Sequence, residues 1–131
     1  MIETKMLAKL KQLFPYLMLE GIETSTTFGF PDVLYGYERS MGVAELKELN
    51  RIPMRKFTVP WRPGQLAWYT RFRKKNMSPY VLILTLMDSW YFITDIKESY
   101  TMAEIQKCYM GVTNELKYSK DTILNVLFPT H

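Results

Sequence analysis

The stretch PDVLYGYERSMGVAELK, residues 31–47, contains two candidate β-strands that are separated by a polar turn. Residues 32–37 carry Val, Leu and Tyr side chains, which favour a strand, and residues 43–46 form a second short apolar run. Residues 38–42 supply the charged and small side chains of the turn between them. The stretch therefore predicts a β-hairpin, and the rest of the chain is interpreted around it.

The hairpin carries charged side chains at positions where they can meet. Period-two alternation sends Glu45 and Lys47 to one face of the sheet, roughly 6.5–7 Å apart, while Leu46 points to the opposite face. If the two strands pair, Asp32 converges with Glu45 at one end of the hairpin. The alternative is a strand-edge Asp32 and a solvated strand face with a weak Glu–Lys pair.

Two converging carboxylates repel each other unless a cation lies between them. Oxygen ligands without nitrogen or sulfur select Mg²⁺ or Mn²⁺. An adjacent ammonium group, here Lys47, would stabilise a metal-bound hydroxide or the extra charge of a pentavalent phosphate. These side chains together indicate phosphodiester hydrolysis that needs no histidine.

The flanking sequence predicts a small sheet with helices around it. Apolar periodicity favours helices at residues 3–19, 63–76, 101–111 and 120–128, and strands at residues 22–28, 80–87 and 90–94. Residues 48–62 lack a clear period and contain two prolines, so we expect a loop there. The predicted fold class is α/β, with a mixed central sheet flanked by helices in one domain over residues 1–131.

Composition excludes several kinds of chemistry. The chain has 131 residues, of which 47% are hydrophobic and 23% charged, as in a globular domain. Cys108 is the single cysteine and His131 the single histidine, which argues against disulfide scaffolds, cysteine zinc sites and histidine-dependent hydrolases. No signal peptide or membrane-spanning apolar run is visible, so we expect a cytoplasmic protein without a membrane partner.

Positive charge is concentrated in the middle of the chain. Between Glu48 and Asp88 there is no acidic residue, and eight basic ones occur: Arg51, Arg55, Lys56, Arg62, Arg71, Arg73, Lys74 and Lys75. Such an asymmetry is typical of a face that binds a polyanion, although a solvated helix face is the alternative. We expect nucleic-acid phosphates to be contacted by Arg55, Lys56, Arg62, Arg71 and Lys74.

The combination Pro31-Asp32 followed by Glu45-Leu46-Lys47 resembles the signature of the PD-(D/E)XK nuclease superfamily. The segments Ile22-Glu23 and Arg62-x-Gly64-Gln65-x-x-Trp68 are similar to those of small phage-type and VRR nucleases. Archaeal Holliday-junction resolvases share the same core layout. The resemblance implies a restriction-endonuclease-like core of αβββαβ order over residues 20–93, with extra C-terminal helices.

The resemblance also implies roles for individual residues. Asp32, Glu45, the backbone carbonyl of Leu46 and Glu23 would be metal ligands, with Glu20 as the alternative to Glu23. Lys47 would be the catalytic lysine. Gln65 would lie near the metal and help to fix the attacking water.

The resulting hypothesis is an Mg²⁺-dependent DNA endonuclease in which Mn²⁺ can substitute and no small-molecule cofactor takes part. By resemblance to resolvases, we expect cleavage of branched DNA by a homodimer, because symmetric nicking of a junction needs two sites. A phage origin would place it in the cytoplasm of the host cell. The alternatives are a non-catalytic nucleic-acid- or protein-binding module on the same fold, and an RNA endonuclease.

Overall fold

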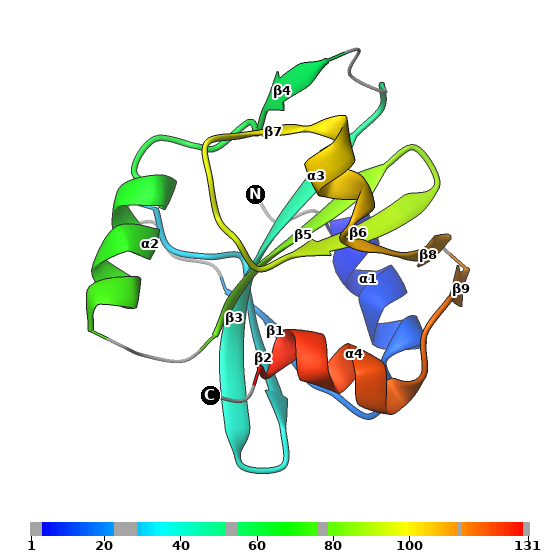
Figure 1. Cartoon of the computed structure of the whole chain (residues 1–131). Coiled ribbons are helices and arrows are strands. Elements are labelled where there is room, and N and C mark those ends of the chain that lie inside the picture. The colour runs from blue at the N-terminus through cyan, green and yellow to red at the C-terminus, as the bar shows by residue number, and fades with distance from the viewer. Residues whose placement is uncertain (1–3, 23–28, 52–54, 76–78, 113, 130–131) are drawn as a thin grey trace.

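A seven-stranded mixed sheet forms the centre of the computed structural model (Figure 1). The structure describes residues 4–22, 29–51, 55–75, 79–112 and 114–129. The sheet has the order β1 (Met18–Gly21), β2 (Val33–Tyr37), β3 (Ser40–Leu49), β5 (Tyr80–Leu86), β6 (Ser89–Ile93), β8 (Tyr109–Val112) and β9 (Glu115–Leu116). A two-stranded sheet joins β4 (Lys56–Thr58) to β7 (Ser99–Thr101). The helices are α1 (Thr4–Leu13), α2 (Gln65–Lys74), α3 (Met102–Gln106) and α4 (Lys120–Leu127).

The predicted fold class is confirmed: a mixed sheet is flanked by helices, two of which follow the core. The β2–β3 hairpin predicted from residues 31–47 is present, with Val33 opposite Ala44. Its turn is shorter than the expected residues 38–42, because Ser40 already pairs with Tyr37 and β3 runs from Ser40 to Leu49. Strand β3 runs parallel to β5, and the chain between them contains α2. Every residue of β5 is buried, as expected for a strand that is covered on both faces.

Each face of the sheet carries its own hydrophobic cluster. Helices α1 and α4 cover one face, where Leu10 and Leu127 pack into the same cluster as Leu46 on β3. The opposite face holds Leu82 and Leu84 beneath β4, β7 and α3. Leu46 therefore points away from the face that holds its neighbours Glu45 and Lys47, as alternation predicts.

The predicted helix at residues 3–19 is wrong beyond Leu13. Proline lacks an N–H and clashes with the preceding turn, so Pro15 prevents continuation, and the chain enters β1 at Met18. The apolar side chains that follow Pro15 alternate between buried and exposed, which is a strand pattern. The predicted strand at residues 22–28 therefore begins too late, and residues 23–28 of it lie outside the described part of the chain.

Two further predictions need correction. The expected loop at residues 48–62 contains the end of β3 and the short strand β4, which pairs with β7. The helix expected at residues 101–111 begins with a capping box formed by Thr101 and Glu104 but ends at Gln106. The following residues form β8 because β6 offers them an antiparallel partner, which local periodicity does not report. Within the described ranges, no helix is long and apolar enough to cross a membrane.

Candidate active site

Asp32 directly precedes β2, at the end of the hairpin where β3 extends beyond its pairing with β2. Its Oδ2 accepts a hydrogen bond of 3.0 Å from the backbone N–H of Leu46. Its own N–H donates to the carbonyl of Ala44 at 3.1 Å. The pairing of β2 with β3 ends at Val33 and Ala44, so the Asp32 carboxylate accepts the hydrogen bond of the Leu46 N–H in place of a β2 carbonyl. The side chain is thereby fixed, and only 4% of Asp32 is exposed.

Glu45 lies on β3 beside this carboxylate and is fully buried. Its Oε2 accepts a hydrogen bond from Nε2 of Gln65 and lies 3.4 Å from Nζ of Lys47. Its Oε1 has no hydrogen-bond partner within the described residues. Burial, reinforced by the negative charge of Asp32, raises the pKa of Glu45 to about 7, although Lys47 and Arg62 oppose the shift.

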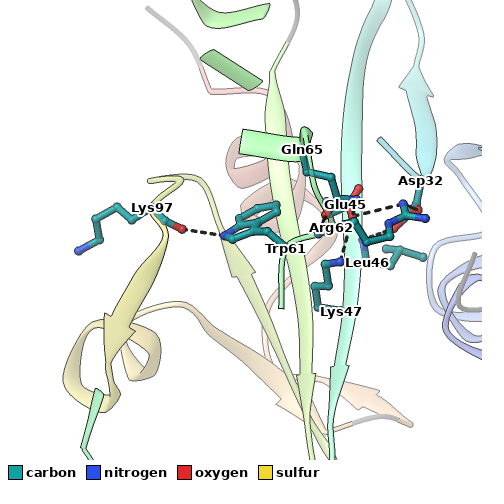
Figure 2. A network of polar contacts seen from close by, with 8 residues as sticks. All are labelled: Asp32, Glu45, Leu46, Lys47, Trp61, Arg62, Gln65 and Lys97. Carbon is teal, nitrogen blue, oxygen red and sulfur yellow. Dashed lines mark hydrogen bonds and ion pairs between the residues drawn. The ribbon is translucent and has the colours of Figure 1, made fainter. Parts of the chain in front are cut away.

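Arg62 spans the two carboxylates (Figure 2). Its Nη2 lies 2.9 Å from Oδ1 of Asp32 and 3.7 Å from Oε2 of Glu45. The backbone N–H of Arg62 donates to Oε1 of Gln65 at 2.6 Å, so the amide of Gln65 connects the loop before α2 to Glu45. Two acids and three polar or basic side chains therefore form one network at the edge of β3.

The loop before α2 reaches this network because two glycines pack against each other. Gly29 and Gly64 both have positive φ, 82° and 86°. A Cβ atom on Gly29 would lie 2.2 Å from the carbonyl oxygen of Gly64, which is closer than atoms can approach. The segment leading to Asp32 thus rests directly on the start of α2, and this contact sets the position of Gln65 relative to Glu45.

Gly29→Ala is expected to lower the free energy of unfolding by about 2–4 kcal/mol, because it adds a strained φ and a backbone clash. Denaturant unfolding monitored by circular dichroism measures this loss. Gly36→Ala is the matched control, since a Cβ there meets ordinary contacts at 3.5 Å, and we expect a change below about 1 kcal/mol. Equal losses in the two variants would contradict the close packing at Gly29.

The structure brings together Asp32, Glu45, Lys47 and Gln65, four of the residues that the sequence singled out. Leu46 contributes its N–H to Asp32, and in a strand the carbonyl of the same residue points to the same edge. Glu23 lies outside the described residues. Its alternative, Glu20, is exposed on β1 and pairs across the sheet with Leu34.

The basic residues separate into two groups. Arg62 belongs to the carboxylate network. The sequence predicted a phosphate contact for Arg62 and not this contact with both acids. Arg55, Lys56, Arg71 and Lys74 are exposed and lie outside that network, on and next to β4 and in the last turns of α2. Arg62 lies three residues before Gln65, in the loop that leads into α2, and this spacing is a sequence signal that ties Arg62 to the site.

The donor set fits a hard divalent cation. The available ligand atoms are carboxylate and carbonyl oxygens, and Glu45 Oε1 is buried without a partner among the described residues. The hydroxyl of Tyr80 is buried without one as well, and burial with the charges of Glu45 and Asp32 raises its pKa. In the part of the chain that the structure describes, no three Asp, Glu, His or Cys side chains cluster, so two carboxylates would form the core of such a site.

Fold and site together define the class: a restriction-endonuclease-like α/β fold with a buried carboxylate–lysine cluster at the edge of its central parallel strand pair. Among solved structures, the chain is similar to a Holliday junction resolvase from the archaeal hyperthermophile Archaeoglobus fulgidus, with a TM-score of 0.60 and 13% sequence identity. The match covers 79% of this chain and 92% of the resolvase. No protein-family model matches the chain, and neither does any curated protein sequence.

Proposed function

We propose that this protein is an Mg²⁺-dependent nuclease that hydrolyses phosphodiester bonds in DNA, with Mn²⁺ able to substitute. The single observation that carries the proposal is the convergence of buried Asp32, Glu45 and Lys47 on one edge of β3. Burying three ionisable side chains costs free energy unless they form ion pairs or hydrogen bonds with one another or with a ligand. The similarity to a resolvase fold supports the same reading.

Each residue of the network has a role in this proposal. Asp32, Glu45 and the Leu46 carbonyl would hold Mg²⁺, with Glu23 as the additional ligand predicted from the sequence. The metal would supply a Lewis acid that lowers the pKa of a water molecule. Lys47 would orient that water toward the phosphate and offset negative charge that develops during attack.

Gln65 would act through Glu45. Its amide nitrogen donates to Glu45 Oε2, and its amide oxygen is fixed by the backbone N–H of Arg62. This leaves Oε1 of Glu45 as the oxygen that is free to meet a cation. Gln65 is therefore proposed as a positioning residue that selects which carboxylate oxygen faces the metal.

The exposed face of α2 is the proposed DNA-binding surface. On its inner side Trp68 and Phe72 each pack against Tyr80 of β5 with ring centroids 6.1 Å apart, which holds the helix against the sheet through aromatic contacts. Its last turns present the exposed Arg71, Arg73 and Lys74. Such side chains would anchor phosphates that flank the cleaved bond without reading base sequence.

The Arg71→Ala, Lys74→Ala double variant is expected to bind duplex DNA more weakly and with a shallower salt dependence. Losing two phosphate contacts reduces the slope of log K against log salt concentration by about 1.8. Fluorescence anisotropy over a series of salt concentrations measures the slope. Lys5→Ala, Lys11→Ala removes the same charge from exposed positions on α1 and should leave it unchanged, so equal slopes in both double variants would overturn the assignment.

The substrate and assembly are proposed from the resolvase fold. We infer that branched DNA is cut by a homodimer, because paired nicks across a junction need two sites. Cleavage assays on matched duplex, junction, flap and RNA substrates with Mg²⁺, Mn²⁺ or EDTA test both the activity and its substrate. Metal-dependent cleavage of a junction is expected. If none of the substrates were cleaved, the proposed nuclease activity would be refuted.

A non-catalytic binding module is the second candidate, and one observation favours it. Arg62 forms ion pairs with both carboxylates, so Arg62 and Lys47 together balance the two acids without a metal when all four side chains are ionised. Calorimetric titration with Mn²⁺ separates the candidates, since only the nuclease proposal requires binding at Asp32 and Glu45.

A further inference from the structure

The guanidinium of Arg62 bridges the two carboxylates that a bound cation would share. Its Nη2 approaches Asp32 Oδ1 and Glu45 Oε2 at the same time, at 2.9 and 3.7 Å. The Arg62 side chain is 47% exposed, whereas those of Asp32 and Glu45 are 6% and 0% exposed. The exposure difference places Arg62 on the solvent side of both acids, and Figure 2 marks its contacts with Asp32 and Glu45.

Arg62 is built so that its side chain can move while its backbone stays in place. Its N–H donates to Oε1 of Gln65, and its carbonyl accepts from the N–H of Gln65 at 3.1 Å. Pro63 follows and restricts the chain further. The guanidinium is held through its ion pairs with the two acids, which a competing cation would replace.

The charge of the network also separates two states. Asp32 and Glu45 carry two negative charges, and Lys47 and Arg62 carry two positive ones, so the ionised network is neutral. A dication added beside Arg62 would place four positive charges against two negative ones in a buried site. Moving the guanidinium out to solvent lowers that excess by one charge, and the half-exposed side chain has the room to do so.

Resting on the proposed nuclease function, we propose that Arg62 is the resident cation of the metal-free site. A divalent metal ion would displace the Arg62 guanidinium, and the displaced guanidinium would then bind the DNA phosphate. A guanidinium presents a planar fork of donors that matches phosphate oxygens, and once displaced it remains attached beside the site. Metal binding would then free the Arg62 guanidinium from the two acids, and the guanidinium would hold the phosphate. Arg62 would then be a substrate-binding residue whose phosphate contact depends on the metal.

Arg62→Met tests the inference because methionine keeps much of the side-chain length without the charge. We expect Mn²⁺ to bind this variant at least about tenfold more tightly than the wild type in calorimetry without DNA. We also expect a lower melting temperature than wild type in EDTA, and a difference that disappears at saturating Mn²⁺. Arg39→Met removes a charge from the exposed turn between β2 and β3 and should change neither quantity.

A second measurement uses the wild-type protein and does not depend on the folding of a variant. The Nε–Hε resonance of Arg62, assigned by its absence in Arg62→Lys, should shift on addition of Mg²⁺, while that of the exposed Arg39 should stay in place. An unchanged Arg62 resonance at saturating Mg²⁺ overturns the inference.

The failures of the two proposals are distinguishable. If the wild type binds Mn²⁺ and Arg62→Met binds it equally well, the inference about Arg62 is wrong and the nuclease proposal stands. If destabilisation by Arg62→Met persists at saturating Mn²⁺, Arg62 is only structural. If neither protein binds Mn²⁺, the proposed function itself fails.

Discussion

Lys47→Met is expected to reduce the rate of DNA cleavage by about 10²–10³-fold while leaving binding of Mn²⁺ and DNA largely intact. Lys47 is 8% exposed, and its Nζ lies 3.4 Å from Oε2 of Glu45, so its ammonium would lie beside the proposed metal site. A positive charge in a desolvated site stabilises a developing negative charge far more strongly than a positive charge at the surface does. Methionine fills the same volume without that charge.

Single-turnover cleavage under saturating protein and Mg²⁺ measures the chemical step, and calorimetry and anisotropy follow the two binding steps. Lys11→Met is the matched control because Lys11 is exposed on α1, away from the proposed DNA-binding residues. It should cleave at close to the wild-type rate. If Lys47→Met cleaved within about threefold of wild type, the assignment of Lys47 to the reaction would be wrong.

Glu45→Gln is expected to abolish both Mn²⁺ binding and cleavage, because it removes one of the two buried carboxylates of the proposed metal site. An amide oxygen is a neutral and weaker ligand for a hard dication than a carboxylate. Glutamine has nearly the same shape, so the fold should persist. Calorimetry with Mn²⁺ and cleavage assays with Mg²⁺ measure the two losses.

The same substitution changes how stability depends on pH in the absence of metal. Glu45 has a folded-state pKa of about 7 against an ordinary 4.5, so the folded state holds its proton more tightly than the unfolded state. Its stabilising contribution is present below pH 4.5 and is lost as pH rises to about 7. Relative to Glu45→Gln, the wild type should lose at most about 3 kcal/mol across this range.

Denaturant unfolding in EDTA at several pH values between 4.5 and 7.5 measures that difference. Glu48→Gln is the control, because Glu48 is exposed on the same strand. The wild type and Glu48→Gln should show parallel pH dependences. A wild-type curve parallel to that of Glu45→Gln would mean that burial does not raise the pKa of Glu45.

Local sequence predicted the hairpin and the faces of its residues because both depend on short-range geometry. Alternation along β3 places Glu45 and Lys47 on one face and Leu46 in the core on the other. Pairing of β2 with β3 then brings Asp32 to Leu46 across fourteen residues of chain. These contacts follow from strand period and hairpin register, which the amino-acid pattern encodes directly.

Where the prediction of secondary structure was wrong, a tertiary partner or a proline decided the outcome. Periodicity extended the first helix past Pro15, although β1 forms there by pairing with β2. It also extended the helix after Thr101, although residues 109–112 pair with β6. Apolar residues satisfy either structure, so the available sheet edge determines which one forms.

The sequence by itself determined the α/β fold class, the two strands of the hairpin and the meeting of Asp32 with Glu45 and Lys47. Only the tertiary structure decided that Gln65 fixes one oxygen of Glu45 and that Arg62 covers both acids. Those contacts depend on where the start of α2 rests, and that place is set by Gly29 packed on Gly64. Packing between segments that are more than thirty residues apart is decided by the shape of the folded chain, and no period in the sequence records it.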